Sequence, residues 1–335
     1  MRLFRHPNEV TPECRGAAIA LGNFDGVHLG HQAVIARAFD LARAYDSAVG
    51  ILTFEPHPRA FFKPDLPAFR ITPFRIKMRV LQALGQEKDM GLDFVCCLAF
   101  DQHLASMTAP EFASKVLRDG LNAAHIVVGE DFCFGKGRSG DVKTLKALGQ
   151  ELKFGVDAVS ATVDGKGAVH SSTLIREHLQ QGRPQAAAAI LGRAWEIEGR
   201  VEHGQKLGRK LGFPTANLLM TGGYLMPKLG IYAVKAAVDE GDHPAWIDGV
   251  ASLGYRPTVD GTHIQFEVYL FDYSGDLYGR HLRVALLEFL RPELKFPDLE
   301  ALKAQIAADC AEARQMLAHY HGPKPGPLGR GNFVL

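Results

Sequence analysis

The sequence predicts two domains of different class, an α/β domain built on a parallel β-sheet and then an antiparallel β domain. In the first half, short apolar runs alternate with longer amphipathic segments, which is typical of strands and helices in a parallel sheet. In the second half, from Trp195 onward, β-like segments follow one another with turn residues between them and without helices. At 335 residues, the chain is long enough for each half to bury its own core.

The elements of the first half follow from this alternation. Buried strands are expected at residues 17–24, 48–54, 94–100 and 123–130, and amphipathic helices at residues 31–45, 75–86 and 109–121. Three of these strands run into polar, Gly-rich or Pro-containing segments, at residues 22–28, 53–59 and 128–140. Because ligands bind at the carboxyl ends of the strands in such sheets, we expect a site there.

The second half reads as a barrel or a sandwich, introduced by two short helices that Gly182 and Pro184 interrupt. Its β segments are expected at residues 195–203, 230–239, 245–254, 263–272 and 281–290, and a closing helix at 298–320. A Pro/Gly-rich tail follows, which we expect to be mobile. The predicted domains are therefore residues 1–185 and 186–321, with the tail at 322–335.

Composition narrows the class of protein. A formal charge of +1 gives no electrostatic reason to expect a nucleic-acid or membrane-surface partner. The five cysteines form no CxxC pair, which favours a reducing compartment and argues against a zinc site. The N-terminal segment has no apolar stretch of the signal-peptide kind, and no later run approaches a membrane span. We expect a cytoplasmic protein, and self-association is left open.

Two histidines, His28 and His31, stand at the start of the first predicted helix in the string GNFDGVHLGH. A helix start binds anions, because its first backbone N–H groups point outward and its dipole is positive there. Imidazoles three residues apart lie on one side of that turn and can donate to phosphate oxygens. A metal site is the alternative, but two histidines need further ligands and no HExxH-like carboxylate accompanies them.

GNFDGVHLGH resembles the HxGH signature of nucleotidyltransferases, in the form found in the bacterial bifunctional riboflavin kinase/FAD synthetase family. TFEPHPR (53–59), VGEDFCFGKGRSG (128–140) and SSTLIREHLQQG (171–182) follow in the order of that family. The resemblance implies a Rossmann-like FMN adenylyltransferase domain in which His28 and His31 hold the ATP phosphates, with Asn23 as a polar contact beside them. Further nucleotide contacts are expected from Ser171, Ser172, Thr173 and Arg176, and tentative flavin contacts from Phe132, Phe134, Lys136 and Arg138.

The string GRVEHGQKLGRKLGFPTANL (199–218) carries a second constellation. Its glycines, Gly208 and Gly212 among them, let the backbone approach a polyphosphate, and no Walker A loop is present. The string resembles the riboflavin kinase signature, which implies a β-barrel kinase whose nucleotide-bound Mg²⁺ is held by Thr215 and Asn217. The same resemblance makes Glu267 the general base toward riboflavin. Alternation along its strand places Glu267 opposite Phe266 and Val268, although a rim glutamate would show the same pattern.

Together these motifs predict a bifunctional enzyme that phosphorylates riboflavin with ATP to FMN and then adenylylates FMN to FAD, releasing pyrophosphate. Two alternatives compete with it. An adenylyltransferase for another phosphorylated substrate explains HxGH but leaves the second motif without a role. A non-catalytic flavin-binding protein keeps both folds but has no use for intact His28, His31 and Glu267.

Overall fold

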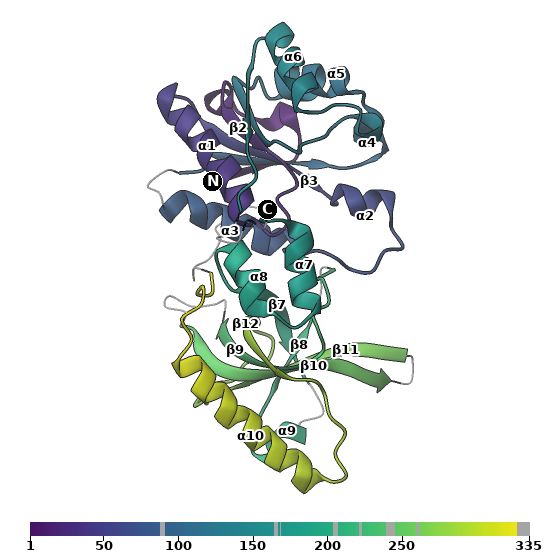
Figure 1. Cartoon of the computed structure of the whole chain (residues 1–335), viewed down its shortest axis with the longest axis vertical. Coiled ribbons are helices and arrows are strands. Elements are labelled where there is room, and N and C mark those ends of the chain that lie inside the picture. Colours follow the sequence, from purple (N-terminus) through teal and green to yellow (C-terminus); the bar gives the residue numbers. More distant parts are fainter. Residues whose placement is uncertain are drawn as a thin grey trace. The chain divides into compact units, whose positions relative to one another are not determined.

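The computed structural model (Figure 1) describes residues 1–87, 91–163, 167, 169–203, 207–220, 223–238, 245–258 and 261–326. These residues form two compact units. The first contains Met1–Pro67 and Phe74–Ser171, and the second contains Ala68–Pro73 and the described residues from Ser172 to Gly326. The chain therefore enters the second unit twice, first through a short segment and then for the rest of its described length.

A six-stranded parallel sheet forms the centre of the first unit, in the order β1-β4-β3-β2-β5-β6. Its strands are β1 (Arg2–Phe4), β2 (Ala18–Leu21), β3 (Val49–Glu55), β4 (Phe94–Ala99), β5 (His125–Gly129) and β6 (Gly155–Val159). The strand order reverses between β2 and β5, because the chain goes from β2 to β3 on one side and adds β5 on the other. Parallel sheets bind ligands in the crevice that such a reversal leaves at the carboxyl ends.

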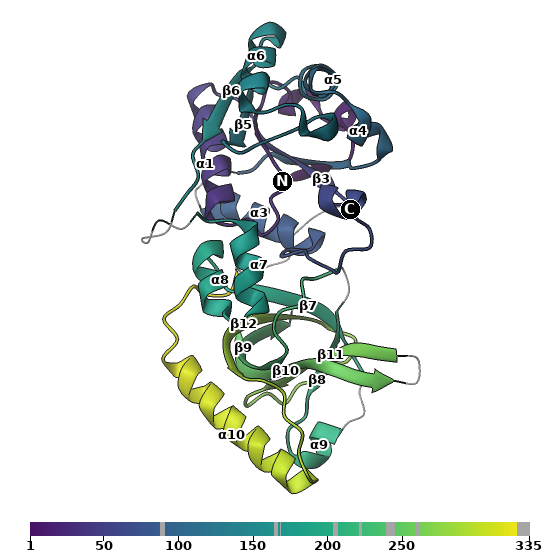
Figure 2. The ribbon, with the colours of Figure 1, turned by 45° about the vertical axis from the view of Figure 1, so that its right-hand side comes forward.

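Helices cover this sheet, as Figure 2 shows for α1, α3, α5 and α6. They are α1 (Leu29–Ala44), α2 (Pro58–Phe62), α3 (Phe74–Glu87), α4 (Gln102–Ser106), α5 (Ala109–Glu111), the π-helix η3 (Phe112–Gly120) and α6 (Val142–Leu152). Helix α1 packs against β2 and β5, and α6 packs against β6 and η3. Short 3₁₀ turns are η1 (Pro7–Glu9), η2 (Pro12–Cys14) and η4 (Lys136–Arg138). The core includes Phe94 and Ile126 of the sheet with Phe112 of η3.

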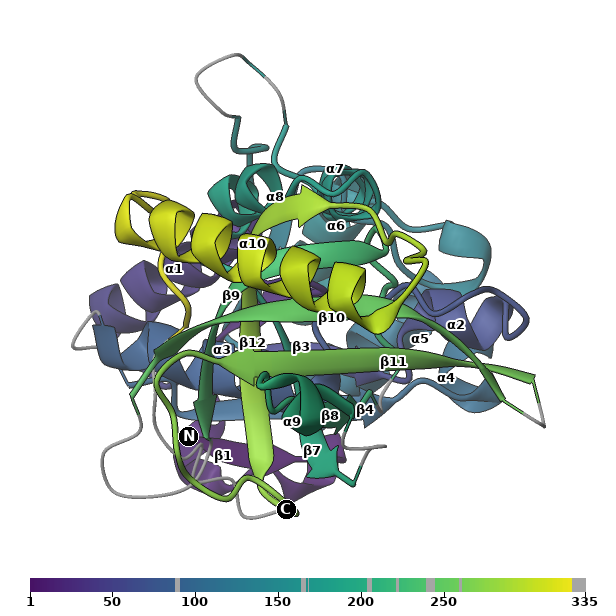
Figure 3. The same ribbon diagram turned by 90° about the horizontal axis from the view of Figure 1, so that it is seen from below.

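The second unit is a closed antiparallel barrel with the order β10-β11-β8-β7-β12-β9. Its strands are β7 (Trp195–Glu202), β8 (Ala216–Leu219), β9 (Gly230–Val238), β10 (Ile247–Thr258), β11 (Gly261–Leu270) and β12 (His281–Arg291). Its helices are α7 (Ser172–Gln180), α8 (Pro184–Leu191), α9 (Leu207–Leu211) and α10 (Leu299–Ala318). Helix α10 crosses the outside of the barrel over β9, β10 and β12 (Figure 3).

The segment Ala68–Pro73, here called the strap, is bound to the second unit by hydrogen bonds. The indole Nε1 of Trp195 donates to the carbonyl of Ile71 at 2.7 Å, and the backbone N–H of Leu225 donates to the carbonyl of Arg70 at 2.8 Å. Trp195 is almost completely buried. The strap therefore supplies an acceptor that a buried indole N–H needs.

The described part of the Pro/Gly-rich tail, up to Gly326, is hydrogen-bonded to the barrel, and the expected mobility of the tail stays a prediction. The N–H of Ala194 donates to the Lys324 carbonyl at 2.9 Å, and the N–H of Gly326 donates to Oε1 of Glu196 at 2.7 Å. Glu196 also accepts two hydrogen bonds from Arg283, at 2.9 and 2.7 Å, in an ion pair whose side chains are 5 % and 2 % exposed. Residues 327–335 of the predicted tail lie outside the described residues.

The predicted fold class is confirmed, and the choice between barrel and sandwich is resolved as a barrel. Strands β1, β6 and β8 were not predicted: β1 and β8 are very short, and the residues of β6 are all only partly buried, so its apolar signal is weak. The predicted helix over 109–121 contains α5 and η3. The contacts group α7 and α8 with the barrel, whereas the domain boundary at residue 185 stays a prediction.

Candidate active sites

The turn between β2 and α1 depends on left-handed backbone. Phe24, Gly26 and Val27 have φ angles of 50°, 95° and 44°, and the side chains of Phe24 and Val27 are fully buried. Left-handed backbone strains residues other than glycine, so the buried side chains and nearby hydrogen bonds must stabilise this turn. Its consequence is that His28 leaves the turn in extended conformation and becomes the N-cap of α1.

The two predicted histidines lie together at the first turn of α1. The N–H of His31 donates to Nδ1 of His28 at 3.3 Å, and the two rings stack with centroids 3.6 Å apart. Because Nδ1 accepts, the neutral His28 ring carries its proton on Nε2, where it can donate to a ligand. Gly30 leaves room beside them, since a Cβ there would lie 3.2 Å from the His28 ring, a tight contact, and 3.4 Å from the His170 carbonyl.

The His170 carbonyl lies beside Gly30, which also shows where the SST motif (residues 171–173) begins. Ser171, the last residue of the first unit in this region, follows His170 directly, so the structure brings its backbone close to the HxGH turn. Ser172, Thr173 and Arg176 belong to the second unit. There, Nε of Arg176 donates to the Phe69 carbonyl of the strap at 2.9 Å. The nucleotide contacts predicted for these four residues stay predictions.

The loop after β5, residues 130–141, is hydrogen-bonded within itself and to the backbone of Met107. Phe134 and Gly140 exchange two backbone hydrogen bonds, at 2.9 and 3.0 Å, and the N–H of Lys136 donates to the Met107 carbonyl at 2.7 Å. Phe134 is a core residue, whereas Phe132 is half-buried with its ring stacked 5.7 Å from that of Phe134. Lys136 and Arg138 are exposed. Of the four predicted flavin contacts, Phe134 therefore has the least surface to offer, and all four stay predictions.

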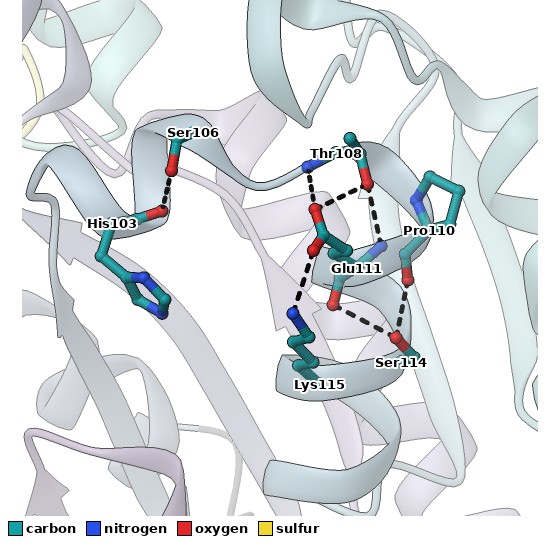
Figure 4. A network of polar contacts seen from close by, with 7 residues as sticks. All are labelled: His103, Ser106, Thr108, Pro110, Glu111, Ser114 and Lys115. Carbon is teal, nitrogen blue, oxygen red and sulfur yellow. Dashed lines mark hydrogen bonds and ion pairs between the residues drawn. The ribbon is translucent and has the colours of Figure 1, made fainter.

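The support beneath this loop is the capping box of α5, drawn in Figure 4. The Glu111 carboxylate accepts from the N–H and the hydroxyl of Thr108, at 3.0 and 2.9 Å, and pairs with Lys115 at 3.0 Å (Figure 4). The Thr108 N–H, and then Lys115, lower the pKa of Glu111 to about 2. Gly135 packs against the backbone of Ala109 so closely that a Cβ would lie 2.7 Å from its nitrogen. The cap thus fixes the segment on which the loop rests.

In the barrel, register brings the predicted kinase residues side by side. Glu267 of β11 is paired with Asn217 of β8 on one side and with Ser252 of β10 on the other. Its neighbours Phe266 and Val268 are buried, as the alternation predicts. Gln265, two residues away on the same face, donates from Nε2 to Oδ1 of Asn217 at 3.3 Å and is hydrogen-bonded to Glu267.

A cavity of about 420 Å³ lies beside Glu267 on the outer face of the barrel. Thr215, Ser252, Gln265 and Glu267 line it, and apolar side chains form much of the rest: Leu211, Phe213, Ile231, Tyr269, Phe296, Leu302 and Ile306. A pocket of this size, mostly apolar with a few convergent polar groups, is typical of a small-molecule site. Glu267 and Thr215 thus line the same cavity, and their predicted roles stay predictions.

The glycines predicted for this site have distinct roles. A Cβ on Gly208 would lie 2.4 Å from the Phe213 carbonyl and 3.2 Å from Oγ1 of Thr215, so only glycine allows α9 to approach the segment before β8. Gly212 has a φ of 91°, in the region that favours glycine. Gly204 and Lys206 of the same motif lie outside the described residues.

One wall of the cavity was not predicted. Arg291, at the end of β12, donates from Nε and Nη2 to the two oxygens of Asp309 on α10, at 2.8 and 2.6 Å. Asp309 is 3 % exposed and also accepts from Gln305 at 3.0 Å. Burial raises the pKa of the nearby Glu293 carboxyl, although Arg291 opposes the rise. The sequence did carry a signal for this wall, because Asp309 lies on the apolar face of the helix predicted at residues 298–320, where an acidic side chain needs a partner.

Among the residues that the structure describes, no helix is long and apolar enough to cross a membrane. Within the same residues, no group of three or more His, Cys, Asp or Glu side chains is arranged to hold a metal ion.

Comparison with known proteins matches a family model to each half of the chain. The FAD synthetase family model matches residues 10–173, and the riboflavin kinase model matches residues 191–317. The chain is 42 % identical over 319 residues to a bifunctional riboflavin kinase/FMN adenylyltransferase of Pseudomonas fluorescens, covering 95 % of this chain and 98 % of that protein. It is 39 % identical over 317 residues to the protein of the same description from Escherichia coli K12, covering 94 % and 97 %.

A solved structure from Streptococcus pneumoniae, described as a macrolide-efflux protein, superposes with a TM-score of 0.81 at 29 % identity and covers 95 % of this chain and 98 % of its own. That description names a transport activity, whereas both family models and the curated relatives name two enzymatic ones. On the extent and identity of these matches, the chain belongs to the bifunctional riboflavin kinase/FMN adenylyltransferase family.

Proposed function

We propose that this chain makes FAD from riboflavin in two ATP-dependent steps, with one reaction in each unit. The barrel phosphorylates riboflavin to FMN, and the α/β unit adenylylates FMN to FAD. The observation that carries the proposal is the pairing of Glu267 with Asn217 beside a cavity that Thr215 also lines, in a chain whose other unit presents two stacked histidines at a helix start. The family supplies the two activities, and the residue roles below are inferred.

In the kinase reaction, Glu267 accepts the proton of the 5′-hydroxyl of riboflavin as that oxygen attacks the γ-phosphorus of ATP and ADP leaves. The hydrogen bond from Gln265 orients the Glu267 carboxylate. The apolar part of the cavity takes the isoalloxazine ring, which leaves the ribityl arm to reach Glu267.

Magnesium fits the donor set at this site. Thr215 supplies a hydroxyl oxygen and Asn217 an amide oxygen, which are the hard ligands that Mg²⁺ takes together with nucleotide phosphates and water. When bound, the ion neutralises charge on the phosphates. We assign Thr215 and Asn217 to it, with Gly208 and Gly212 shaping the turn around the nucleotide.

In the adenylyl transfer, a phosphate oxygen of FMN attacks the α-phosphorus of ATP and pyrophosphate leaves. His28 and His31 donate to the phosphate oxygens and stabilise the charge that develops there, and Asn23 is a further polar contact. Ser171 is assigned to the triphosphate, whereas the same role for Ser172, Thr173 and Arg176, which the contacts group with the second unit, stays a prediction from the family motif. Phe132, Lys136 and Arg138 are assigned to the flavin or its phosphate, with Phe134 shaping their loop.

The test follows both reactions in the full chain, supplied with riboflavin, ATP and Mg²⁺ and monitored by chromatography of the flavins. Replacing His28 and His31 together by Ala should stop the sequence at FMN, with FAD formation at least about 10²-fold slower. Glu267→Ala should slow FMN formation by about 10²–10⁴-fold and leave conversion of added FMN to FAD intact.

Matched controls use exposed residues of the same type in the same unit. His103→Ala in the first unit and Glu300→Ala in the second should leave both activities unchanged. Absence of both FMN and FAD with the folded wild type would contradict the proposed function. Loss of both activities from either site variant would contradict separate sites.

The cytoplasmic location expected from the sequence is part of this proposal, because both steps consume ATP. Self-association stays a prediction, and sedimentation of the full chain with and without FMN and ATP tests it.

A further inference from the structure

The ammonium of Lys77 on α3 is among the buried charges that have no role in the reactions described above. Lys77 is 5 % exposed, and its Nζ donates to the Asn23 carbonyl at 3.2 Å and to the Thr53 hydroxyl at 3.3 Å. The Thr53 hydroxyl itself donates to the same carbonyl at 3.2 Å. A buried ammonium is costly unless its donors are satisfied, so these contacts determine where it sits.

The ammonium lies at the ligand-binding edge of the sheet. Thr53 is near the carboxyl end of β3, where it is the register partner of Cys97 in β4, and Asn23 follows the end of β2. Burial raises the pKa of the Cys97 thiol, and Lys77 opposes this rise, which also indicates that the positive charge is close to β4. Lys77 is therefore hydrogen-bonded at the carboxyl ends of β2 and β3, and its charge lies near β4.

Lys77 holds one end of the turn that leads to the histidines. The Asn23 carbonyl is held by Lys77 and Thr53, although the residue itself is exposed, and the Val27 carbonyl at the other end accepts from Nε2 of Gln32 at 3.0 Å. Between these points lie the three left-handed residues described above. A strained turn of this kind persists only when its surroundings fix it.

We propose that Lys77 is a positioning residue for adenylyl transfer: its bond to the Asn23 carbonyl keeps the turn in the form that aims Asn23 and His28 at the polyphosphate. This inference rests on the proposed function of the first unit. Displacement of a catalytic group by about 1 Å can slow a reaction about 10²-fold, so the effect falls on the reaction rate.

The test replaces Lys77 by Met in the full chain, which keeps the length and apolar stem of the side chain and removes its charge and donors. The kcat of FAD formation from FMN should fall about 10²-fold, with much smaller changes in the KM of ATP and FMN. The kcat of FMN formation from riboflavin in the same sample should be unchanged, because the kinase residues belong to the other unit. Lys146→Met, at an exposed lysine of the same unit, is the matched control and should change neither rate.

A second pair of variants keeps the inference testable if Lys77→Met fails to fold. Thr53→Val removes one hydroxyl at constant shape and should lower the kcat of FAD formation about 2–10-fold, the value of one hydrogen bond. Thr53→Ser keeps the hydroxyl and should restore the rate.

Three results would overturn the inference: an unchanged kcat in Lys77→Met, equal loss of both activities in that variant, or equal rates for Thr53→Val and Thr53→Ser. A wild-type chain that forms FMN but no FAD would instead refute the proposed function on which the inference rests.

Discussion

The buried ion pair between Glu196 and Arg283 allows a sharp prediction about the stability of the barrel. Glu196→Gln keeps the shape of the side chain but removes its charge. The variant leaves the Arg283 guanidinium, 2 % exposed and 5.1 Å from the Trp246 ring, without this carboxylate partner. It also weakens the acceptor for the Gly326 N–H.

The expected loss of unfolding free energy follows from the burial of this ion pair. Removing one member of a buried, hydrogen-bonded ion pair costs about 3–5 kcal/mol, because the remaining charge stays desolvated. With a urea dependence of about 2 kcal/mol per molar, the unfolding midpoint should fall by about 1.5–2.5 M.

The assay uses the only two tryptophans of the chain, Trp195 and Trp246, which both belong to the second unit. Tryptophan fluorescence during urea unfolding therefore reports on the barrel unit alone. Asp272→Asn is the control, because it breaks an ion pair of similar geometry with Arg314 whose side chains are 80 % and 49 % exposed. Its expected cost is about 0–1 kcal/mol. Equal midpoint shifts in the two variants would refute the reasoning from burial.

Three further predictions concern the two sites. Gly30→Ala should slow FAD formation and spare FMN formation, because the added Cβ crowds the His28 ring; an unchanged FAD rate would contradict this. Because Glu111 has a pKa of about 2 in the folded state against 4.5 normally, its cap stabilises the first unit above pH 4.5 and loses that effect as the pH falls toward 2. The stability difference between the wild type and Glu111→Gln, followed by far-UV circular dichroism, should shrink over that range and not grow. Asp309→Asn should raise the KM of riboflavin, because it weakens the ion pair with Arg291 that forms one wall of the cavity. A KM equal to that of the wild type would indicate that this wall does not contribute to riboflavin binding.

Local patterns predicted the parts of the sites that lie close together in sequence. His28 and His31 are three residues apart at a helix start, and a helical turn is enough to bring them together. Glu267 could be placed on the polar face of its strand by a period of two alone. Its neighbour Asn217 could not, because strand β8 is four residues long and its pairing with β11 is set by closure of the barrel.

The parts that were missed are long-range polar contacts. Lys77 stands on the apolar side of α3 with Val80 and Leu81, which is a signal, but nothing in the sequence shows that its partner is a backbone carbonyl 54 positions away. Arg291 and Asp309 present the same difficulty, since their pairing depends on how α10 crosses the barrel. Sequence patterns can show that a charged residue lies on the apolar face of an element. Only the packed structure shows which groups pair with that charge.

The strap affects how this chain can be divided. A barrel expressed from Ser172 would lack residues 68–73, so the buried Trp195 indole and the Leu225 N–H would each lose the carbonyl that they bind. Two missing acceptors in a buried site are a substantial loss for one domain. A synthetic peptide of the strap should therefore rescue an isolated barrel in trans. A chimaera that exchanges whole units between relatives would therefore need to take the strap and the barrel from the same protein.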